Sequence, residues 1–223
     1  MHKTVQNLIN IQNLIKSKQS VLENNKIIPK IIAVSKTFKL DHILPLIEHG
    51  HIDYGENKVQ EALEKWSEIK SNNNKIKLHL IGKLQTNKVK ISIKLFDYIH
   101  SVDNEKLARK ISDEQKKQNL KPKLFIQVNI GNESQKNGIH IKKLEEFHNF
   151  CKELNLNVVG IMCIPPIDED PEKSFLRMNY LKKKLNLEEL SMGMSSDYLI
   201  AVNFNATFLR IGSKIFGQRI SKL

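Results

Sequence analysis

Eight short apolar runs recur along the chain, and helical patterns lie between most of them. Strands that are buried on both faces produce continuous apolar runs of this kind. Strands that alternate with helices predict a parallel sheet, and eight of them predict an α/β protein with a (β/α)8 barrel, the TIM-barrel fold. The runs span residues 31–34, 52–54, 78–81, 98–101, 124–129, 158–162, 189–192 and 208–211.

Five other segments carry apolar residues at helical spacing. The first of them precedes the first strand and therefore predicts an extra N-terminal helix. Asp103 is placed to cap one of the later helices, and Pro171 is placed to open another. The five segments span residues 5–15, 40–47, 107–111, 144–154 and 175–181.

The length of 223 residues is near the lower limit for such a barrel. No linker rich in Pro, Gly or Ser divides the chain, so residues 1–223 are expected to form a single domain. The alternative fold is an open doubly wound sheet. That fold usually has a glycine-rich turn after its first strand, where this chain has Ser35, Lys36 and Thr37.

The net charge of +12 raises the question of an anionic partner. The lysines are interleaved with Glu and Asp, however. The densest runs, Lys116–Lys117 and Lys182–Lys184, fall on predicted helices, where they indicate solvated outer faces. No nucleic-acid-binding motif occurs, and an aromatic content of 6% offers no stacking platform. We therefore expect no nucleic-acid partner.

The chain also lacks the marks of a membrane or secreted protein. No apolar run approaches the roughly 18 residues that span a membrane, and the N-terminal segment lacks the apolar block of a signal peptide. Cys151 and Cys163 are too few for a disulfide scaffold and suit a reducing compartment. The expectation is a cytoplasmic protein with no membrane partner, present as a monomer or a weak dimer.

Lys36 ends the first apolar run, within the segment Ile31 to Lys39. A lysine in this place has its stem in the core and its amine at the rim of the sheet. A crowded, partly dry rim favours a neutral amine, which can attack an aldehyde. Lys36 is therefore a candidate for Schiff-base formation, and a strand-ending lysine that serves only solubility is the ordinary alternative.

Two turns at the carboxyl ends of the last strands suit an anion. Ser195 lies between the seventh strand and a helix, while Gly212 and Ser213 directly follow the eighth strand. Barrels often hold phosphate in the loops after strands seven and eight, where helix N-termini offer N–H groups. For the first turn, the alternative is that Ser196 or Asp197 simply caps a helix.

Arg210 precedes Gly212 by two residues, so both are expected to face the same side of the strand. A buried guanidinium needs an acceptor, because leaving it unpaired costs roughly 3–5 kcal/mol. Its partner is either a ligand atom or a protein carboxylate. The strand ends carry no carboxylate cluster and no His/Cys group at metal spacing, so neither a glycosidase nor a metal site is expected.

One cofactor fits a lysine, an arginine and a phosphate cradle together. Pyridoxal 5′-phosphate (PLP) carries an aldehyde, a ring nitrogen and a phosphate, and arginine is a known partner of the ring nitrogen.

Seven motifs, in order along nearly the whole chain, then show a family resemblance. The chain resembles the pyridoxal phosphate homeostasis proteins, single-domain PLP-binding barrels similar to the N-terminal domain of alanine racemase. The resemblance implies the barrel of PLP fold type III. The motifs are AVSKTF around Lys36, YGENKVQEA at 54–62, HLIGKLQTNK at 79–88, NIGNESQKNGI at 129–139, GIMCIPP at 160–166, LSMGMSSD at 190–197 and RIGSKIFGQR at 210–219.

The resemblance also implies roles for individual residues. Lys36 matches the lysine that holds PLP as a Schiff base, and Arg210 matches the arginine that faces the pyridine nitrogen. Ser195, Gly212 and Ser213 match the positions that bind the phosphate in the family.

Three further residues belong to family motifs. Asn57 matches a residue beside the cofactor. His79 and Met162 lie near the barrel core, where cofactor contact and core packing remain open alternatives. The chain departs from the family pattern at Lys83, where proline is usual, and at Thr86, where serine is usual, and Lys83 leaves the path of its loop in doubt.

The resemblance implies a role in intracellular PLP (vitamin B6) and amino-acid homeostasis, with PLP-dependent apoenzymes as candidate partners. An always-charged guanidinium favours an unprotonated ring nitrogen and a weaker electron sink. Racemases with this arrangement add a second acid/base residue, and no tyrosine here is a convincing candidate. We expect a protein that binds PLP on Lys36 without robust catalysis. The alternative is a weak amino-acid racemase or transaldimination enzyme at the same site.

Overall fold

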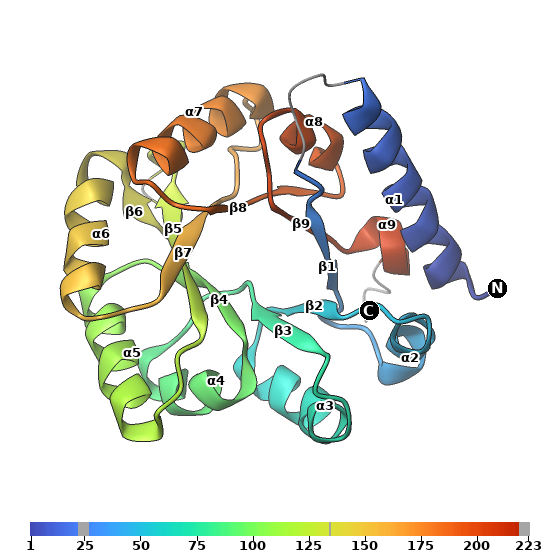
Figure 1. Ribbon diagram of the computed structural model, residues 1–223, viewed down its shortest axis with the longest axis horizontal. Coiled ribbons are helices and arrows are strands. Elements are labelled where there is room, and N and C mark those ends of the chain that lie inside the picture. The colour runs from blue at the N-terminus through green and yellow to red at the C-terminus, as the bar shows by residue number, and fades with distance from the viewer. Residues whose placement is uncertain (22–26, 134, 219–223) are drawn as a thin grey trace.

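Eight parallel strands form a closed barrel in the computed structural model, which describes residues 1–21, 27–133 and 135–218 (Figure 1). They are β1 (Lys30–Val34), β2 (Asp53–Glu56), β3 (Lys77–Leu80), β4 (Tyr98–Val102), β5 (Lys123–Asn129), β7 (Val158–Cys163), β8 (Glu189–Met194) and β9 (Phe208–Ile211). The pairings of β1 with β9 and of β4 with β5 complete the circle. The predicted (β/α)8 barrel is confirmed, and the open doubly wound sheet is wrong.

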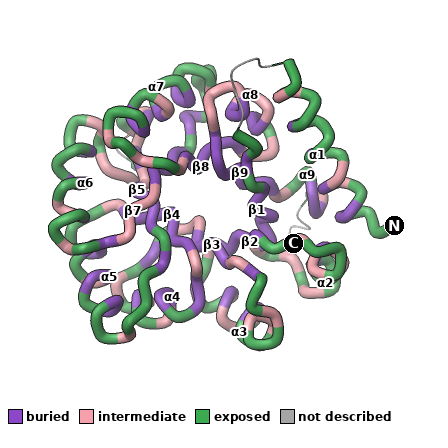
Figure 2. Tube along the Cα trace, viewed as in Figure 1, coloured by how far each residue is buried: buried purple, intermediate pink, exposed green. Residues whose placement is uncertain are grey.

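The strands are apolar along their length because both of their faces are covered. Every residue of β2, β4 and β9 is buried, since one face of each strand looks into the barrel and the other packs against helices. Figure 2 shows the buried trace along the ring and the exposed trace on the outer sides of the helices. A short strand, β6 (Ile139–His140), pairs with β5 and was not predicted, because two residues carry no periodicity.

Helices surround the ring, and the five predicted ones are present as α1, α2, α5, α6 and α7. Two 3-10 turns, η1 (Thr86–Lys88) and η2 (Ile141–Lys143), lead into helices. The helices are α1 (Lys3–Ser20), α2 (Leu40–Glu48), α3 (Val59–Asn72), α4 (Val89–Leu95), α5 (Glu105–Gln118), α6 (Leu144–Glu153), α7 (Pro171–Lys184), α8 (Tyr198–Asn203) and α9 (Ser213–Phe216).

The extra N-terminal helix covers a gap in the outer layer. The helix after the last barrel strand, α9, has only 4 residues. Helix α1 packs against α2, α8 and α9, and Figure 1 shows it running along that side of the barrel. The side chain of Asn7 donates a hydrogen bond to the Ile215 carbonyl at 2.9 Å. Helix α1 therefore supports α9, which follows the last strand directly.

Two predictions about the helices are wrong in detail. Asn104, not Asp103, caps α5, because its side chain lies next to the first helical residue and accepts from the Leu107 N–H at 2.9 Å. Lys182 does not lie on a solvated face. It is 9% exposed, on the same side of α7 as Met178, and burial lowers the pKa of its amine.

Both cysteines are free thiols, Cys151 and Cys163, and burial raises the pKa of each to about 12. None of the described helices has both the length and the apolar character that a membrane crossing requires.

Candidate functional site

A cavity of about 530 Å³ opens at the carboxyl ends of the barrel strands. Strand β9 and the turns and loops that follow β1, β2, β8 and β9 supply its polar lining. Six of the eight residues singled out from the sequence line it together, and the other two do not. The six are Lys36, Asn57, Ser195, Arg210, Gly212 and Ser213.

Lys36 lies in the turn that follows β1, one residue beyond the buried Ser35. The Ser35 hydroxyl donates to Glu56 Oε1 at 2.8 Å. The Lys65 amine donates to the Ser35 carbonyl at 3.0 Å and to the same Glu56 oxygen at 3.0 Å. The chain on the N-terminal side of Lys36 is therefore held by β2 and α3.

The residue on the other side of Lys36 is held as well. Thr37 has a φ of 68°, in the left-handed region that a β-branched residue rarely enters. Its N–H donates to Glu61 Oε1 at 2.7 Å, and Glu61 also accepts from the Lys65 amine at 3.2 Å. Such a conformation persists only where surrounding contacts impose it, and turns of this kind cluster at functional sites.

Asn57 follows β2, and the loop after β3 packs directly on it. A Cβ atom at Gly82 would lie 2.2 Å from the Asn57 carbonyl oxygen, so only glycine permits this approach. Lys83, which departs from the family pattern, donates to Asn137 Oδ1 at 3.0 Å and is not part of the cavity lining. The departure therefore leaves the position of Asn57 intact.

Ser195 joins the two turns that the sequence suggested for an anion. Its hydroxyl oxygen accepts from the N–H groups of Gly212 at 3.3 Å and Lys214 at 3.5 Å, which lie at the start of α9. Ser213 lines the same cavity. Hydroxyl groups and backbone N–H groups at a helix start are the donors that a phosphate group prefers.

The turn before Ser195 requires a glycine. Gly193 has a φ of +87°, and a Cβ atom there would lie 2.7 Å from the Ala201 side chain. Asp197 precedes α8, as the capping alternative supposed. Its carboxylate, however, accepts from the Met194 N–H at 2.6 Å and makes no side-chain hydrogen bond to the helix.

Arg210 is buried, with 5% of its surface exposed. Its Nη1 donates to the Ser191 hydroxyl and its Nη2 to the Cys163 carbonyl, each at 2.8 Å. Burial lowers the pKa of the guanidinium, which remains charged at neutral pH. Within the part of the chain that the structure describes, no carboxylate forms an ion pair with it. The positive charge at the cavity wall is therefore not neutralised by a direct protein partner.

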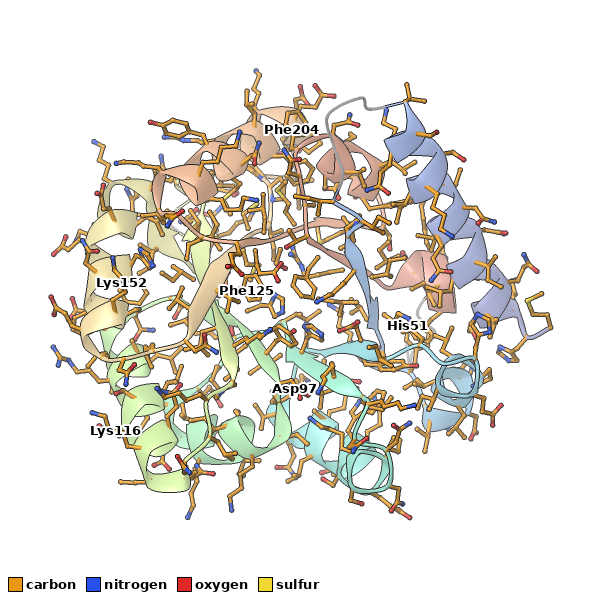
Figure 3. The ribbon with its side chains drawn as sticks, viewed as in Figure 1. His51, Asp97, Lys116, Phe125, Lys152 and Phe204 are labelled. Carbon is orange, nitrogen blue, oxygen red and sulfur yellow. The ribbon has the colours of Figure 1, made fainter. Side chains whose placement is uncertain are left out.

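His79 and Met162 lie inside the barrel and outside the lining of the cavity. His79 sits between Asp53 and His100, with a ring nitrogen 3.0 Å from each. Met162 packs in an interior cluster that includes Phe125. Figure 3 shows Phe125 in the middle of the ring, whereas Lys116 and Lys152 lie on its outer helices.

Several lining residues were not singled out from the sequence. Phe38, Ile81 and Ile164 form apolar walls, and Phe38 stacks on Phe216 with ring centroids 5.0 Å apart. Lys214 also lines the cavity, and its place directly after Ser213 was the available signal.

The charge of the site has one sign. Across residues 1–21, 27–133 and 135–218, the ionisable side chains in the lining are Lys36, Arg210 and Lys214, and all three are basic. The described part of the chain contains no group of three or more His, Cys, Asp or Glu arranged to hold a metal ion. The lining therefore offers an amine, a guanidinium and a cluster of anion donors to one anionic ligand. Arg219, the last residue of the last motif, and Ser134 lie outside the described residues.

Comparison with known proteins agrees with this barrel fold. The family described as "Alanine racemase, N-terminal domain" matches residues 7–220. A pyridoxal phosphate homeostasis protein from Aquifex aeolicus (strain VF5) is 38% identical over 200 residues, which cover 85% of this chain and 87% of that protein.

Solved structures show the same similarity. PipY from Synechococcus elongatus PCC7942, solved with PLP bound, has a TM-score of 0.78 and 32% identity over 91% of this chain and 100% of that chain. An alanine racemase from Clostridium difficile 630 has a TM-score of 0.74 and 19% identity, and the match covers 99% of this chain and 58% of that one. The second likeness concerns the fold alone.

The matched domain defines a class of barrel proteins, those with the alanine racemase N-terminal fold. Within that class, the chain belongs to the family of pyridoxal phosphate homeostasis proteins, as its motifs predicted.

Proposed function

We propose that this protein binds PLP in the cavity at the carboxyl ends of the strands. One observation carries the proposal. Arg210 is buried beside the cavity and, among the described residues, donates to neutral acceptors, while Lys36, Ser195 and Ser213 line the same space. An anionic ligand with a ring-nitrogen acceptor would use these groups together.

The residues present fit the parts of PLP. The hydroxyls of Ser195 and Ser213 would hold the phosphate at the start of α9, where the Gly212 and Lys214 N–H groups donate to Ser195 and orient its hydroxyl. Arg210 would donate to the pyridine nitrogen, and Asn57 lies in the lining beside them. The aldehyde of bound PLP supplies carbonyl chemistry toward an amine, and Lys36 would take it as a Schiff base.

We propose retention of PLP rather than rapid turnover. A charged guanidinium at the ring nitrogen keeps a proton off that atom, so the ring withdraws electrons less. The described lining offers amines and a guanidinium as ionisable groups, without a phenol or an imidazole. These observations support a carrier that holds the cofactor in a recoverable form.

The physiological role is proposed by analogy with the family. Relatives such as the Aquifex aeolicus protein are named for pyridoxal phosphate homeostasis. For this chain we propose the same role in the cytoplasm, with PLP-dependent apoenzymes as recipients of the cofactor. A Schiff base suits this role, because an imine limits the free aldehyde and releases it when another amine or water attacks.

Borohydride reduction in the presence of PLP tests the proposal. Reduction converts a Schiff base into a stable amine, so we expect the mass of a phosphopyridoxyl group on the peptide that contains Lys36. Lys36→Ala should lose this label and the absorbance of bound PLP. Lys116→Ala, on an exposed outer face, serves as the matched control and should keep both. Labelling that Lys36→Ala leaves unchanged would contradict the assignment.

Turnover is a separate measurement on the same proteins. Chiral chromatography after incubation with L- or D-alanine should show no racemisation above that of free PLP. Racemisation that disappears in Lys36→Ala would overturn the non-catalytic part of the proposal and favour a weak racemase.

A further inference from the structure

A continuous line of hydrogen bonds crosses the barrel interior and ends at Arg210. Its members come from β2, β3, β4, β8 and β9, and none is more than 7% exposed. The links are Asp53 Oδ1 to His79 Nε2 at 3.0 Å, His79 Nδ1 to His100 Nε2 at 3.0 Å, His100 Nδ1 to Ser191 Oγ at 2.9 Å and Ser191 Oγ to Arg210 Nη1 at 2.8 Å.

The two ends give this line a single direction. The guanidinium of Arg210 can only donate, and the carboxylate of Asp53 can only accept. His79 Nε2 must therefore carry a proton. A neutral His79 then has a bare Nδ1, which accepts from His100 Nε2–H. The bare Nδ1 of His100 accepts in turn from the Ser191 hydroxyl, whose oxygen accepts from Arg210.

The reverse direction conflicts with Asp53. It would place a bare His79 Nε2 against a carboxylate oxygen at 3.0 Å, so two acceptors would face each other without a proton. In the forward direction, every proton along the line has one acceptor. Both imidazoles are then neutral and carry their proton on Nε2.

The surroundings hold both rings in this state. His79 stacks on Tyr98 with centroids 4.3 Å apart and planes at 7°. His100 stacks on Phe125 with centroids 4.2 Å apart and planes at 11°. Burial lowers the pKa of both histidines, which keeps them neutral at physiological pH.

We propose that Asp53, His79, His100 and Ser191 form a positioning network that holds the guanidinium of Arg210 in one orientation at the cavity. The effect on PLP binding rests on the function proposed above. The direction of the hydrogen bonds is independent of that function. These are positioning residues, since only Arg210 would meet the cofactor.

The network explains how a buried arginine is held without being neutralised at the site. A carboxylate in direct contact would bind the guanidinium strongly and compete with a ligand nitrogen. A hydroxyl whose own proton is committed to His100 presents a lone pair to Nη1 and leaves the full positive charge in place. The carboxylate of the network, Asp53, lies at the opposite end of the line, at the amino end of β2.

Nitrogen NMR of the protein without PLP tests the direction of the network. Long-range proton–nitrogen correlations distinguish the two neutral tautomers and the imidazolium. At neutral pH we expect His79 and His100 to be neutral, each with its proton on Nε2. A proton on Nδ1 in either ring, or an imidazolium at either position, would overturn the proposal.

Measurement of PLP binding by variants tests whether the network positions Arg210. Ser191→Ala removes the link between His100 and Arg210, and we expect the dissociation constant for PLP to rise on the order of 10-fold, with an altered absorbance spectrum of bound PLP. Ser191→Thr keeps the hydroxyl and should restore both. Ser112→Ala is the matched control, because Ser112 is also buried and donates to the Leu154 carbonyl outside the network.

The outcomes separate the two proposals. Ser191→Ala binding PLP as Ser112→Ala does, with an unchanged spectrum, would overturn the positioning role. Failure of the wild-type protein to bind PLP would contradict the proposed function. The histidine tautomers would still show whether the hydrogen bonds of the network run in the proposed direction. If Ser191→Thr does not fold, the NMR measurement on the wild-type protein decides alone.

Discussion

Glu56 shows how a single buried carboxylate supports the turn at Lys36. Its Oε1 accepts from the Ser35 hydroxyl, from the Lys65 amine and, at 2.9 Å, from the Trp66 indole. Both charged side chains are largely buried, with 0% of Glu56 and 11% of Lys65 exposed. Such a pair is costly to break, because one charge would remain buried without its partner.

Glu56→Gln should therefore lower the free energy of unfolding by on the order of 3 kcal/mol, measured by urea denaturation at pH 7. Attachment of PLP to Lys36 should also slow, because the turn loses part of its support. Glu145→Gln is the control, since it breaks the Lys184–Glu145 pair, whose side chains are 48% and 61% exposed. That change should cost far less than Glu56→Gln, because solvent screens an exposed ion pair. Equal losses in the two variants would contradict the role of Glu56.

Residue chemistry made part of the site predictable from the sequence. Lys36 and Arg210 stand near strand ends with side chains that suit an aldehyde and a ring nitrogen, and both line the cavity. Their types and places alone left other roles open. The role of Glu56 was not predictable, because its partners come from other elements. His79 belonged to a motif, but only the folded barrel brings it against His100 and Asp53.

At the scale of elements, α1 completes the outer layer. Leu8 is 1% exposed on the face of α1 that packs against the barrel, whereas Leu14 is 50% exposed on the same helix. The strands and five of the helices (α1, α2, α5, α6 and α7) were predictable, because burial of one face gives each of them a periodic pattern of apolar residues. Helix α9 and strand β6 were not, because they are too short to carry a period.

Leu8→Ala should destabilise the protein by about 2 to 5 kcal/mol, since it removes buried methyl groups and leaves a cavity. Leu14→Ala, on the exposed face, should change the free energy of unfolding by no more than about 0.5 kcal/mol. Urea denaturation of both variants measures the difference. A large loss from Leu14→Ala with little from Leu8→Ala would show that α1 packs through its other face.

At the scale of the whole molecule, buried histidines make the stability depend on pH. Burial lowers the pKa of His51, His79 and His100 below the ordinary value of 6.5. Below about pH 6.5 the unfolded chain binds protons that the native protein excludes, so the native state loses stability as the pH falls toward the native pKa values.

The free energy of unfolding should therefore decrease from pH 7 to pH 5. Each such histidine contributes up to about 1.4 kcal/mol per pH unit in that range. Burial raises the pKa of Asp97, but hydrogen bonds from the Lys70 amine and the Leu78 N–H outweigh it and hold the pKa below 3.8, so Asp97 adds its own loss only at lower pH. Urea midpoints at pH 7, 6 and 5 measure the effect. A constant or rising midpoint over this range would contradict it.

The pairing of β1 with β9 also has a consequence for biosynthesis. Arg210 is in register with Ile32, so the strand that leads to Lys36 and the strand that carries Arg210 meet only where the barrel closes. A nascent chain on the ribosome exposes Lys36 long before Arg210 and Ser213 have been made. Contacts so distant in sequence form late and slowly. A vitamin-derived aldehyde would therefore find a complete binding site only on a fully translated and closed barrel.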